Sequence, residues 1–303
     1  MESIEQTLPP GNSSLRRHFQ RAISLPGTEN SGKPRHAASD ISAGDTTQTQ
    51  FIRDWEKKKP FRMSEMPLVP LKPALQAAQQ KITVPILVNE YAWLWLNRQG
   101  DPTSVCQEVY RNQLGANSTV AQRRELWARY LAAKTEFWRS HRQCAGVLHF
   151  CSLGYNRRGD VPQPEGGATS DHWLNVKRLT WQPYFEDFVR DAFNPVGVML
   201  DFWAEEIQSG SQQAIAVAVI NDLDHDWQGN VRLRLVQRGQ TRWNQTRSLT
   251  VPALGRETVR FPSSFAVPAG PSELIAELDS PGNKPVKSRR TLQVRETPIR
   301  RGP

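Results

Sequence analysis

The strongest structural signal in this 303-residue sequence is the run ITVPILV at residues 82–88. A nearly continuous apolar run of this length, rich in β-branched residues, is typical of a strand covered on both faces, as in a parallel sheet. Polar and aromatic residues follow at once, because residues 88–98 read VNEYAWLWLNR. The run therefore predicts a parallel strand whose carboxyl end carries Glu90 among aromatic side chains.

The segments after this strand predict a βα unit. Residues 120–139 have the apolar spacing of a helix, and Ser118 or Thr119 is placed to be its N-cap. Residues 145–150, AGVLHF, predict a second apolar strand, and a further helix near residues 184–193 ends this half. Strand, helix and strand in this order are typical of a parallel sheet or barrel.

The pattern changes at about Val196, where short apolar runs alternate with turn residues. The predicted strands are residues 196–203, 214–220, 231–236, 247–251, 257–261, 273–278 and 290–294. Seven short strands within about a hundred residues predict an immunoglobulin-like sandwich. We expect four parts: a disordered N-terminal segment (1–45, polar and without periodicity), the C-terminal part of a (β/α)8 barrel (46–195), an all-β sandwich (196–296) and a tail (297–303).

The residues Asn89-Glu90-Tyr91 resemble the nucleophile strand of glycoside hydrolase family 2, which contains β-galactosidases, β-mannosidases and β-glucuronidases. In that family a glutamate followed by an aromatic residue ends the seventh barrel strand; Ala92 stands where glycine is common. The resemblance implies that residues 145–150 form the eighth strand and that Glu90 is the nucleophile of retaining β-glycoside hydrolysis. The substrate-binding candidates that it implies by position are Asn89, Tyr91, Trp93, Trp95, His149, Asp171, His172 and Trp173.

The sequence also departs from that family. Retaining glycosidases use two carboxyl groups, one as nucleophile and one as acid/base. The family's acid/base belongs to an Asn-Glu pair after the fourth strand, and no such pair follows an apolar strand upstream of Glu90. A complete barrel takes about 250 residues. We therefore expect the C-terminal fragment of a larger enzyme, from a truncated gene, a wrong start or a split protein, which is not active by itself.

A non-catalytic module that binds carbohydrate or protein is the alternative. An incomplete barrel leaves strand edges and apolar faces open, and such surfaces seek partners, including a missing barrel portion on another chain. The candidate site residues can also have purely structural roles. Glu90 can serve in an ion pair, Trp93 and Trp95 can pack in a core, and a histidine inside an apolar run, such as His149, can be a satisfied core residue.

Composition and motifs limit the classes of partner and cofactor that we expect. The formal net charge of +9 raises a third hypothesis, a basic nucleic-acid binder, but much of the excess lies near the two chain ends and no zinc-finger or RNA-binding motif occurs. No cluster has metal-ligand spacing and no Gly-rich phosphate loop is present, so we expect no metal and no cofactor. Neither a membrane-spanning apolar run nor a signal peptide is found, and the compartment is not predicted.

Overall fold

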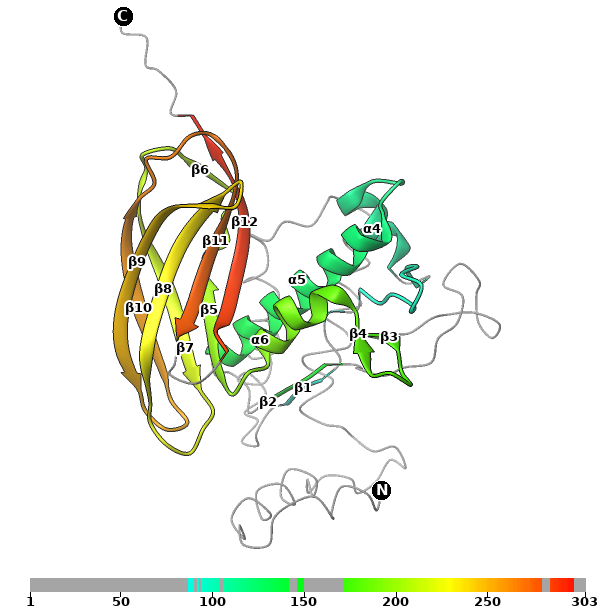
Figure 1. The fold of residues 1–303 in the computed structure, drawn as a ribbon, viewed down its shortest axis with the longest axis horizontal. Coiled ribbons are helices and arrows are strands. Elements are labelled where there is room, and N and C mark those ends of the chain that lie inside the picture. The colour runs from blue at the N-terminus through cyan, green and yellow to red at the C-terminus, as the bar shows by residue number, and fades with distance from the viewer. Residues whose placement is uncertain are drawn as a thin grey trace, which may run out of the picture.

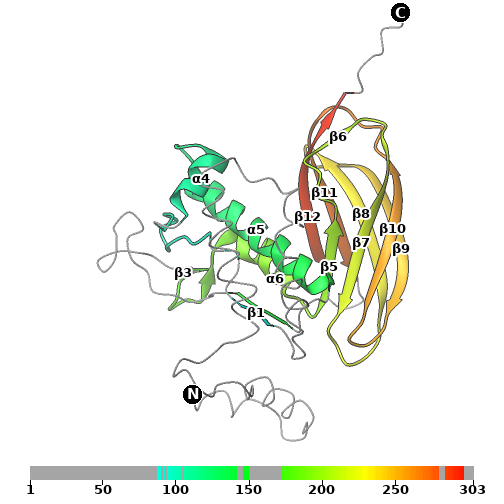
Figure 2. The same ribbon diagram turned by 180° about the vertical axis from the view of Figure 1, so that it is seen from behind.

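The computed structural model describes residues 87–89, 92, 94–103, 106–141, 146–149, 172–279 and 284–296. These residues form a β-sandwich with a helical layer packed against one side of it (Figure 1). The view from behind shows the long helix α5 running between the sandwich and the smaller strand pairs (Figure 2). The expected N-terminal segment 1–45 and the tail 297–303 lie outside the described residues.

The sandwich consists of two sheets. The first has the order β10-β7-β5, with strands Val196–Asp201 (β5), Gln212–Asn221 (β7) and Arg256–Ser264 (β10). The second has the order β6-β12-β11-β8-β9, with strands Glu206–Gln208 (β6), Trp227–Gln237 (β8), Gln240–Val251 (β9), Gly270–Asp279 (β11) and Val286–Arg295 (β12). Within these two sheets, β6–β12 is parallel and the other pairs are antiparallel. The seven strands predicted after Val196 are present, and β6 was not predicted.

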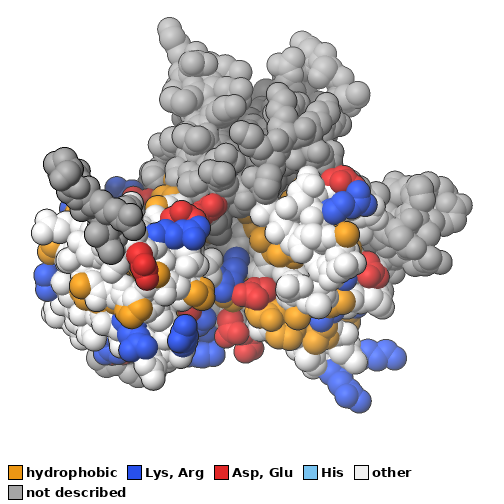
Figure 3. All heavy atoms as spheres, turned by 90° about the horizontal axis from the view of Figure 1, so that it is seen from above, with side chains coloured by type: hydrophobic (Ala, Val, Ile, Leu, Met, Phe, Trp, Pro, Cys, Tyr) orange, Lys and Arg blue, Asp and Glu red, His pale blue; other side chains and the backbone are white. Residues whose placement is uncertain are grey.

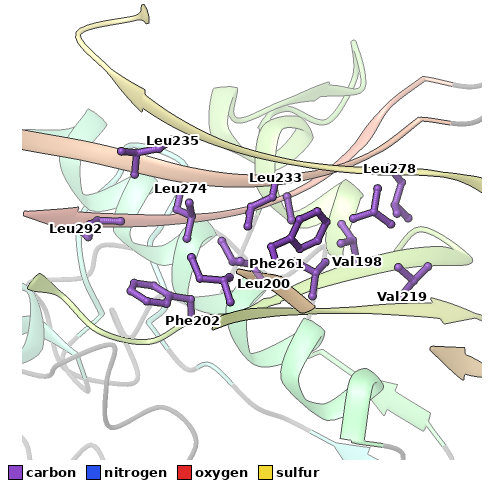
Figure 4. Close-up of a cluster of buried hydrophobic side chains, with 14 of the residues drawn as sticks. Val198, Leu200, Phe202, Val219, Leu233, Leu235, Phe261, Leu274, Leu278 and Leu292 are labelled. Atoms are coloured by element: carbon purple, nitrogen blue, oxygen red, sulfur yellow. The ribbon is translucent and has the colours of Figure 1, made fainter. Parts of the chain in front are cut away.

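Apolar and polar residues alternate along the strands, and the apolar ones form the core of the sandwich. In β8 the side chains of Val231, Leu233 and Leu235 are fully buried, whereas Arg232 and Arg234 between them are partly exposed. Figure 4 shows apolar side chains of both sheets filling the space between them, among them Val198, Leu200, Val219, Phe261, Leu233, Leu235, Leu274 and Leu278. Full burial of one such side chain contributes about 1.5–3 kcal/mol, so this cluster is the main stabilising element of the sandwich.

The helical layer contains α4 (Gln107–Leu114), α5 (Val120–His141) and a π-helical turn η3 (Phe185–Val189) that continues into α6 (Arg190–Ala192). The predicted helix is thus confirmed as α5. Thr119 forms a reciprocal cap: its Oγ1 accepts from the Gln122 backbone N–H (3.2 Å), and the Gln122 side chain accepts from the Thr119 backbone N–H (2.8 Å). Of the two N-cap candidates, Thr119 therefore fills the role.

Two short strand pairs complete this layer. β1 (Leu87–Asn89) pairs in parallel with β2 (Gly146–Leu148), and β3 (Trp173–Asn175) pairs antiparallel with β4 (Thr180–Trp181). The prediction of a partial (β/α)8 barrel is wrong: among the described residues, β1–β2 is the only parallel ladder outside the sandwich, and it has three residue pairs. The sheets of the sandwich are instead antiparallel apart from the short β6–β12 pair.

The error has a physical cause in α5. This helix is buried on two opposite sides, because it contacts β2 and η3 on one side and β5 and β7 of the sandwich on the other. Nearly every position from Trp127 to Trp138 is therefore buried, including the polar residues Lys134 and Glu136, and the sequence does not reveal which layer covers which side. The order strand, helix and strand therefore indicated a barrel segment, although the sandwich covers one side of the helix.

One carboxylate joins α5 to both sheets. Glu136 on α5 accepts hydrogen bonds from Arg290 Nη2 (2.8 Å) and Ser288 Oγ (2.7 Å), both on β12. Ser288 Oγ also accepts from the backbone N–H of Leu200 on β5, at 2.9 Å. All three polar side chains are nearly inaccessible to solvent. The network therefore determines how the helical layer sits on the edge where the two sheets meet.

Arg139, near the end of α5, forms a second junction. Its Nη1 donates to the carbonyl of Ala192 (2.5 Å), and its Nη2 donates to the carbonyl of Asn194 (2.8 Å) and to Asp222 Oδ2 (2.7 Å). Gly197 in β5 leaves room for this guanidinium, because a Cβ there would lie 2.8 Å from Arg139 Nη1. A buried strand position is thus reserved for glycine by a side chain from another layer.

We expect Gly197→Ala to lower the free energy of unfolding by about 1–3 kcal/mol, since the added methyl group overpacks the site. Urea denaturation measures this change. In an Arg139→Met background the same substitution is expected to cost much less, because the crowding atom is gone. An equal cost in both backgrounds would show that the guanidinium is not the reason for the glycine.

Candidate functional site

The carboxyl end of the β1–β2 ladder brings two predicted site residues to one edge. The last pair in the register is Asn89 opposite Leu148, and His149 directly follows β2. Glu90 follows Asn89 in the sequence, but it lies outside the described residues, as do Tyr91, Trp93 and Asp171. The described part of the site is therefore built around His149.

His149 faces a second histidine. The two Nε2 atoms of His149 and His172 are 2.7 Å apart, so one nitrogen donates and the other accepts. His172 precedes β3 and is completely buried, and its Nδ1 lies 3.2 Å from the side-chain nitrogen of Gln182. The backbone N–H of Gln182 also donates to the carbonyl of His172 at 2.8 Å. Gln182 therefore holds His172 in place, and His172 contacts His149 directly.

The network defines the proton positions. Burial, together with the neighbouring His149, holds the pKa of His172 well below its ordinary value, so His172 is neutral. The Gln182 amide N–H donates to His172 Nδ1, which leaves the His172 proton on Nε2. In this tautomer His172 Nε2–H donates to His149 Nε2. His172 acts as the residue that orients His149.

Aromatic rings surround the pair. Trp127 of α5 stacks on His172, with ring centroids 4.3 Å apart and planes 18° apart. Trp181 is stacked between Trp173 (3.5 Å) and Phe185 (4.1 Å), and Phe185 lies 4.9 Å from His172. We call the set Trp127, His149, His172, Trp173, Trp181 and Phe185 the ring array. It runs without a break from α5 to the β3–β4 hairpin.

Members of the ring array differ in exposure. Trp127 and His172 are fully buried, whereas His149, Trp173 and Trp181 are partly exposed. Because Trp173 and Phe185 cover the two faces of Trp181, Trp173 is the member that can offer a ring face to a ligand, and the other rings position it. Trp95, another predicted residue, packs against the core of the helical layer, and its backbone carbonyl accepts from Thr103 N–H (3.1 Å).

Four residues of this site were not predicted: Trp127, Gln182, Trp181 and Phe185. The register offers a signal for one of them: Trp173 is opposite Trp181, so a tryptophan at each end of the short segment 173–181 indicates a hairpin with two neighbouring rings. Nothing local marks Trp127 or Gln182, because their roles depend on contacts across the helical layer.

Lys134 is a further buried titratable group on α5. It is completely buried, and its Nζ lies 5.4 Å from the centre of the Tyr130 ring, one turn earlier. Desolvation lowers the pKa of Lys134 from 10.5 to about 7. Lys134 is seven residues after Trp127 and so lies on the same face of the helix.

Two expectations from composition can be compared with the described residues. Within them, no group of three or more His, Cys, Asp or Glu side chains is arranged to hold a metal ion. The search for a helix long and apolar enough to cross a membrane also found none among those residues.

No family model matches the chain, and no curated protein matches it. Solved structures that match in part include the sporulation control protein Spo0M from Bacillus subtilis (16% identity, TM-score 0.27, 33% of this chain and 48% of that one). A cycloisomaltooligosaccharide glucanotransferase from Paenibacillus sp. matches with 19% identity and TM-score 0.25, over 32% of this chain and 13% of that one. The CARDB domain of a Pyrococcus furiosus protein matches with 12% identity and TM-score 0.27, over 33% of this chain and 94% of that one. Likenesses this low carry no argument about function, and the chain is assigned to no family.

Proposed function

We propose that this chain binds carbohydrate at the ring array and does not hydrolyse glycosidic bonds by itself. The observation that carries the proposal is the stack of three aromatic rings, Trp173, Trp181 and Phe185, in which the partly exposed indole of Trp173 is the outer ring. The resemblance of residues 89–91 to family 2 glycoside hydrolases supports the choice of ligand class.

The ring array suits a sugar for a physical reason. A pyranose has apolar C–H faces and a rim of hydroxyl groups, and it needs both a flat apolar surface and directional polar groups. Sites for small molecules commonly combine aromatic walls with a few well-placed polar groups. Trp181 and Phe185 hold the Trp173 indole in place before a ligand arrives, and such preorganisation lowers the entropic cost of binding.

The second half of the proposal concerns chemistry. Retaining hydrolysis needs a nucleophile and an acid/base about 5–5.5 Å apart. The sequence supplies Glu90 after an apolar strand but no Asn-Glu pair upstream for the second role. Loss of a general acid lowers the rate by about 10²–10⁴-fold. Binding without turnover is therefore the expected behaviour.

The charge distribution favours this proposal over nucleic-acid binding. On the face drawn in Figure 3, the Lys and Arg side chains of the described residues alternate with Asp and Glu side chains and do not gather into one basic patch. Phosphate binding needs cations that are clustered and uncompensated.

Calorimetry with oligosaccharides of β-linked glucose, mannose, galactose and glucuronate tests binding. At least one is expected to bind, and Trp173→Ala is expected to weaken that binding by about tenfold or more through loss of the stacking surface. Phe193→Ala is the matched control, because Phe193 is an exposed aromatic residue just after α6. Failure of every oligosaccharide to bind, or equal affinity of the Trp173→Ala variant, would contradict the proposal.

The same protein is then treated with the matching 2-deoxy-2-fluoro glycosides, which trap a glycosidase nucleophile covalently. We expect the intact mass to stay unchanged. A mass increase that disappears in Glu90→Gln would overturn the claim that the chain does not react by itself, while leaving the binding result intact.

A further inference from the structure

A separate cavity of about 570 Å³ lies at one end of the sandwich, where α6 meets the first residues of β5 and β12 and the loop between β7 and β8. We propose that this cavity binds a small organic anion with an apolar body and a single acidic group, such as an aromatic monocarboxylate. Its volume falls in the range of small-molecule sites, about 300–1,000 Å³. This inference goes beyond the proposed carbohydrate function and does not depend on it.

The inner walls of the cavity are apolar. Pro195, Leu223, Trp227, Leu278 and Val286 line it, and Trp227 is almost completely buried. Gly229 makes room for this tryptophan, because a Cβ there would lie 2.5 Å from the indole ring. A flat apolar ligand body can therefore pack against a ring that is itself held in place.

The polar lining determines the charge of the ligand. Asp191 is buried with both oxygens occupied: Oδ1 accepts from Arg190 Nη2 (2.6 Å), and Oδ2 accepts from the backbone N–H of Lys287 (3.1 Å). His225 is bonded to Asp224 at 3.0 Å. Lys284 is exposed at the rim and forms no ion pair with any described residue.

The balance of these charges is positive. Asp191 compensates Arg190, which leaves Lys284 as the cation without a carboxylate partner among the described residues that line the cavity. An anionic group of a ligand that lies over the apolar walls can form an ion pair with this cation at the rim. A neutral ligand of the same shape gains only the apolar contacts.

The wall formed by the β7–β8 loop is rigid before any ligand binds. The amide nitrogen of Asn221 lies within hydrogen-bonding distance of the carbonyls of His225 (2.8 Å), Pro252 (3.1 Å) and Val251 (3.2 Å), and its Oδ1 accepts from the Leu223 N–H (3.1 Å). Asn221 is fully buried. Since the loop is already ordered, binding carries little cost for ordering it.

Benzoate and its neutral analogue benzamide test the inference in titration calorimetry of the full chain. Benzoate is expected to bind, and benzamide to bind about tenfold more weakly, a difference of about 1.4 kcal/mol. Lys284→Gln is expected to weaken benzoate about tenfold and to leave benzamide unchanged. Lys177→Gln removes the same charge from an exposed position between β3 and β4 and is expected to change neither.

A second variant tests the location. Leu223→Trp places a bulky side chain in a partly exposed wall position and is expected to abolish the binding of both ligands. The inference is overturned if benzoate shows no binding at about 10 mM, if benzamide binds equally well, or if the Leu223→Trp variant still binds benzoate. Equal losses in Lys284→Gln and Lys177→Gln would also overturn it, because they would reflect net charge alone.

Discussion

Lys134→Met is expected to raise the free energy of unfolding at pH 7 by about 1–4 kcal/mol, because the folded protein disfavours the charged amine by several pKa units at about 1.4 kcal/mol each. Lys134 is completely buried, and desolvation lowers its pKa from 10.5 to about 7. Each unit of pKa difference between the folded and unfolded states corresponds to about 1.4 kcal/mol, so the wild-type lysine carries a penalty at neutral pH. Methionine keeps the unbranched stem and removes the charge.

The same lysine predicts a pH dependence with a definite sign. Between pH 7 and 10.5 the unfolded chain holds this proton and the folded chain releases it, so the free energy of unfolding rises with pH in this window. Below pH 7 both states are protonated and the penalty is complete. Urea denaturation at pH 7, 8, 9 and 10 is expected to show this rise in the wild type and a smaller one in Lys134→Met.

Lys177→Met is the control for this series, because Lys177 is exposed and its replacement leaves the buried amine untouched. The control is expected to retain the wild-type slope. A Lys134→Met variant that is less stable than the wild type at pH 7, or that keeps the full slope, would show that Lys134 forms a stabilising interaction that outweighs its desolvation.

Glu136→Gln is expected to lower the free energy of unfolding by about 3–5 kcal/mol, because it leaves the buried guanidinium of Arg290 without its counter-charge. The side chains of Glu136 and Arg290 are 3% and 4% exposed, and the ion pair is 2.8 Å long. Glutamine has nearly the same volume as glutamate, so packing is preserved and the change isolates the charge. Chemical denaturation measures the loss.

The ion pair as a whole is worth less than this loss suggests. Burial raises the pKa of Glu136 above its ordinary value even though Arg290 and Ser288 lower it, so the pair does not fully repay the desolvation of the carboxylate. The double variant Glu136→Met with Arg290→Met is therefore expected to be much more stable than Glu136→Gln alone. A double variant as unstable as the single one would show that the pair itself is strongly stabilising.

Patterns along the chain were sufficient for the elements that depend on local chemistry. Strands such as β8 alternate apolar and polar residues, and a strand covered on one face needs no distant information to show that period. α5 carries its own start signal in the Thr119–Gln122 cap. The barrel prediction failed at the next level, because two apolar strands and a buried helix do not specify the layer that covers them.

The remaining features arise from pairs that are distant in the sequence. His149 and His172 are 23 residues apart, and Glu136 and Arg290 are 154 residues apart; neither pair has a local signature. The lowered pKa of Lys134 also depends on the tertiary structure. The sequence of α5 is the same whether Lys134 faces solvent or packs against another layer, and only packing desolvates it. The periodicity of the sequence indicates which residues are buried. The packing of the layers decides which buried polar groups contact one another, and desolvation then shifts their pKa values.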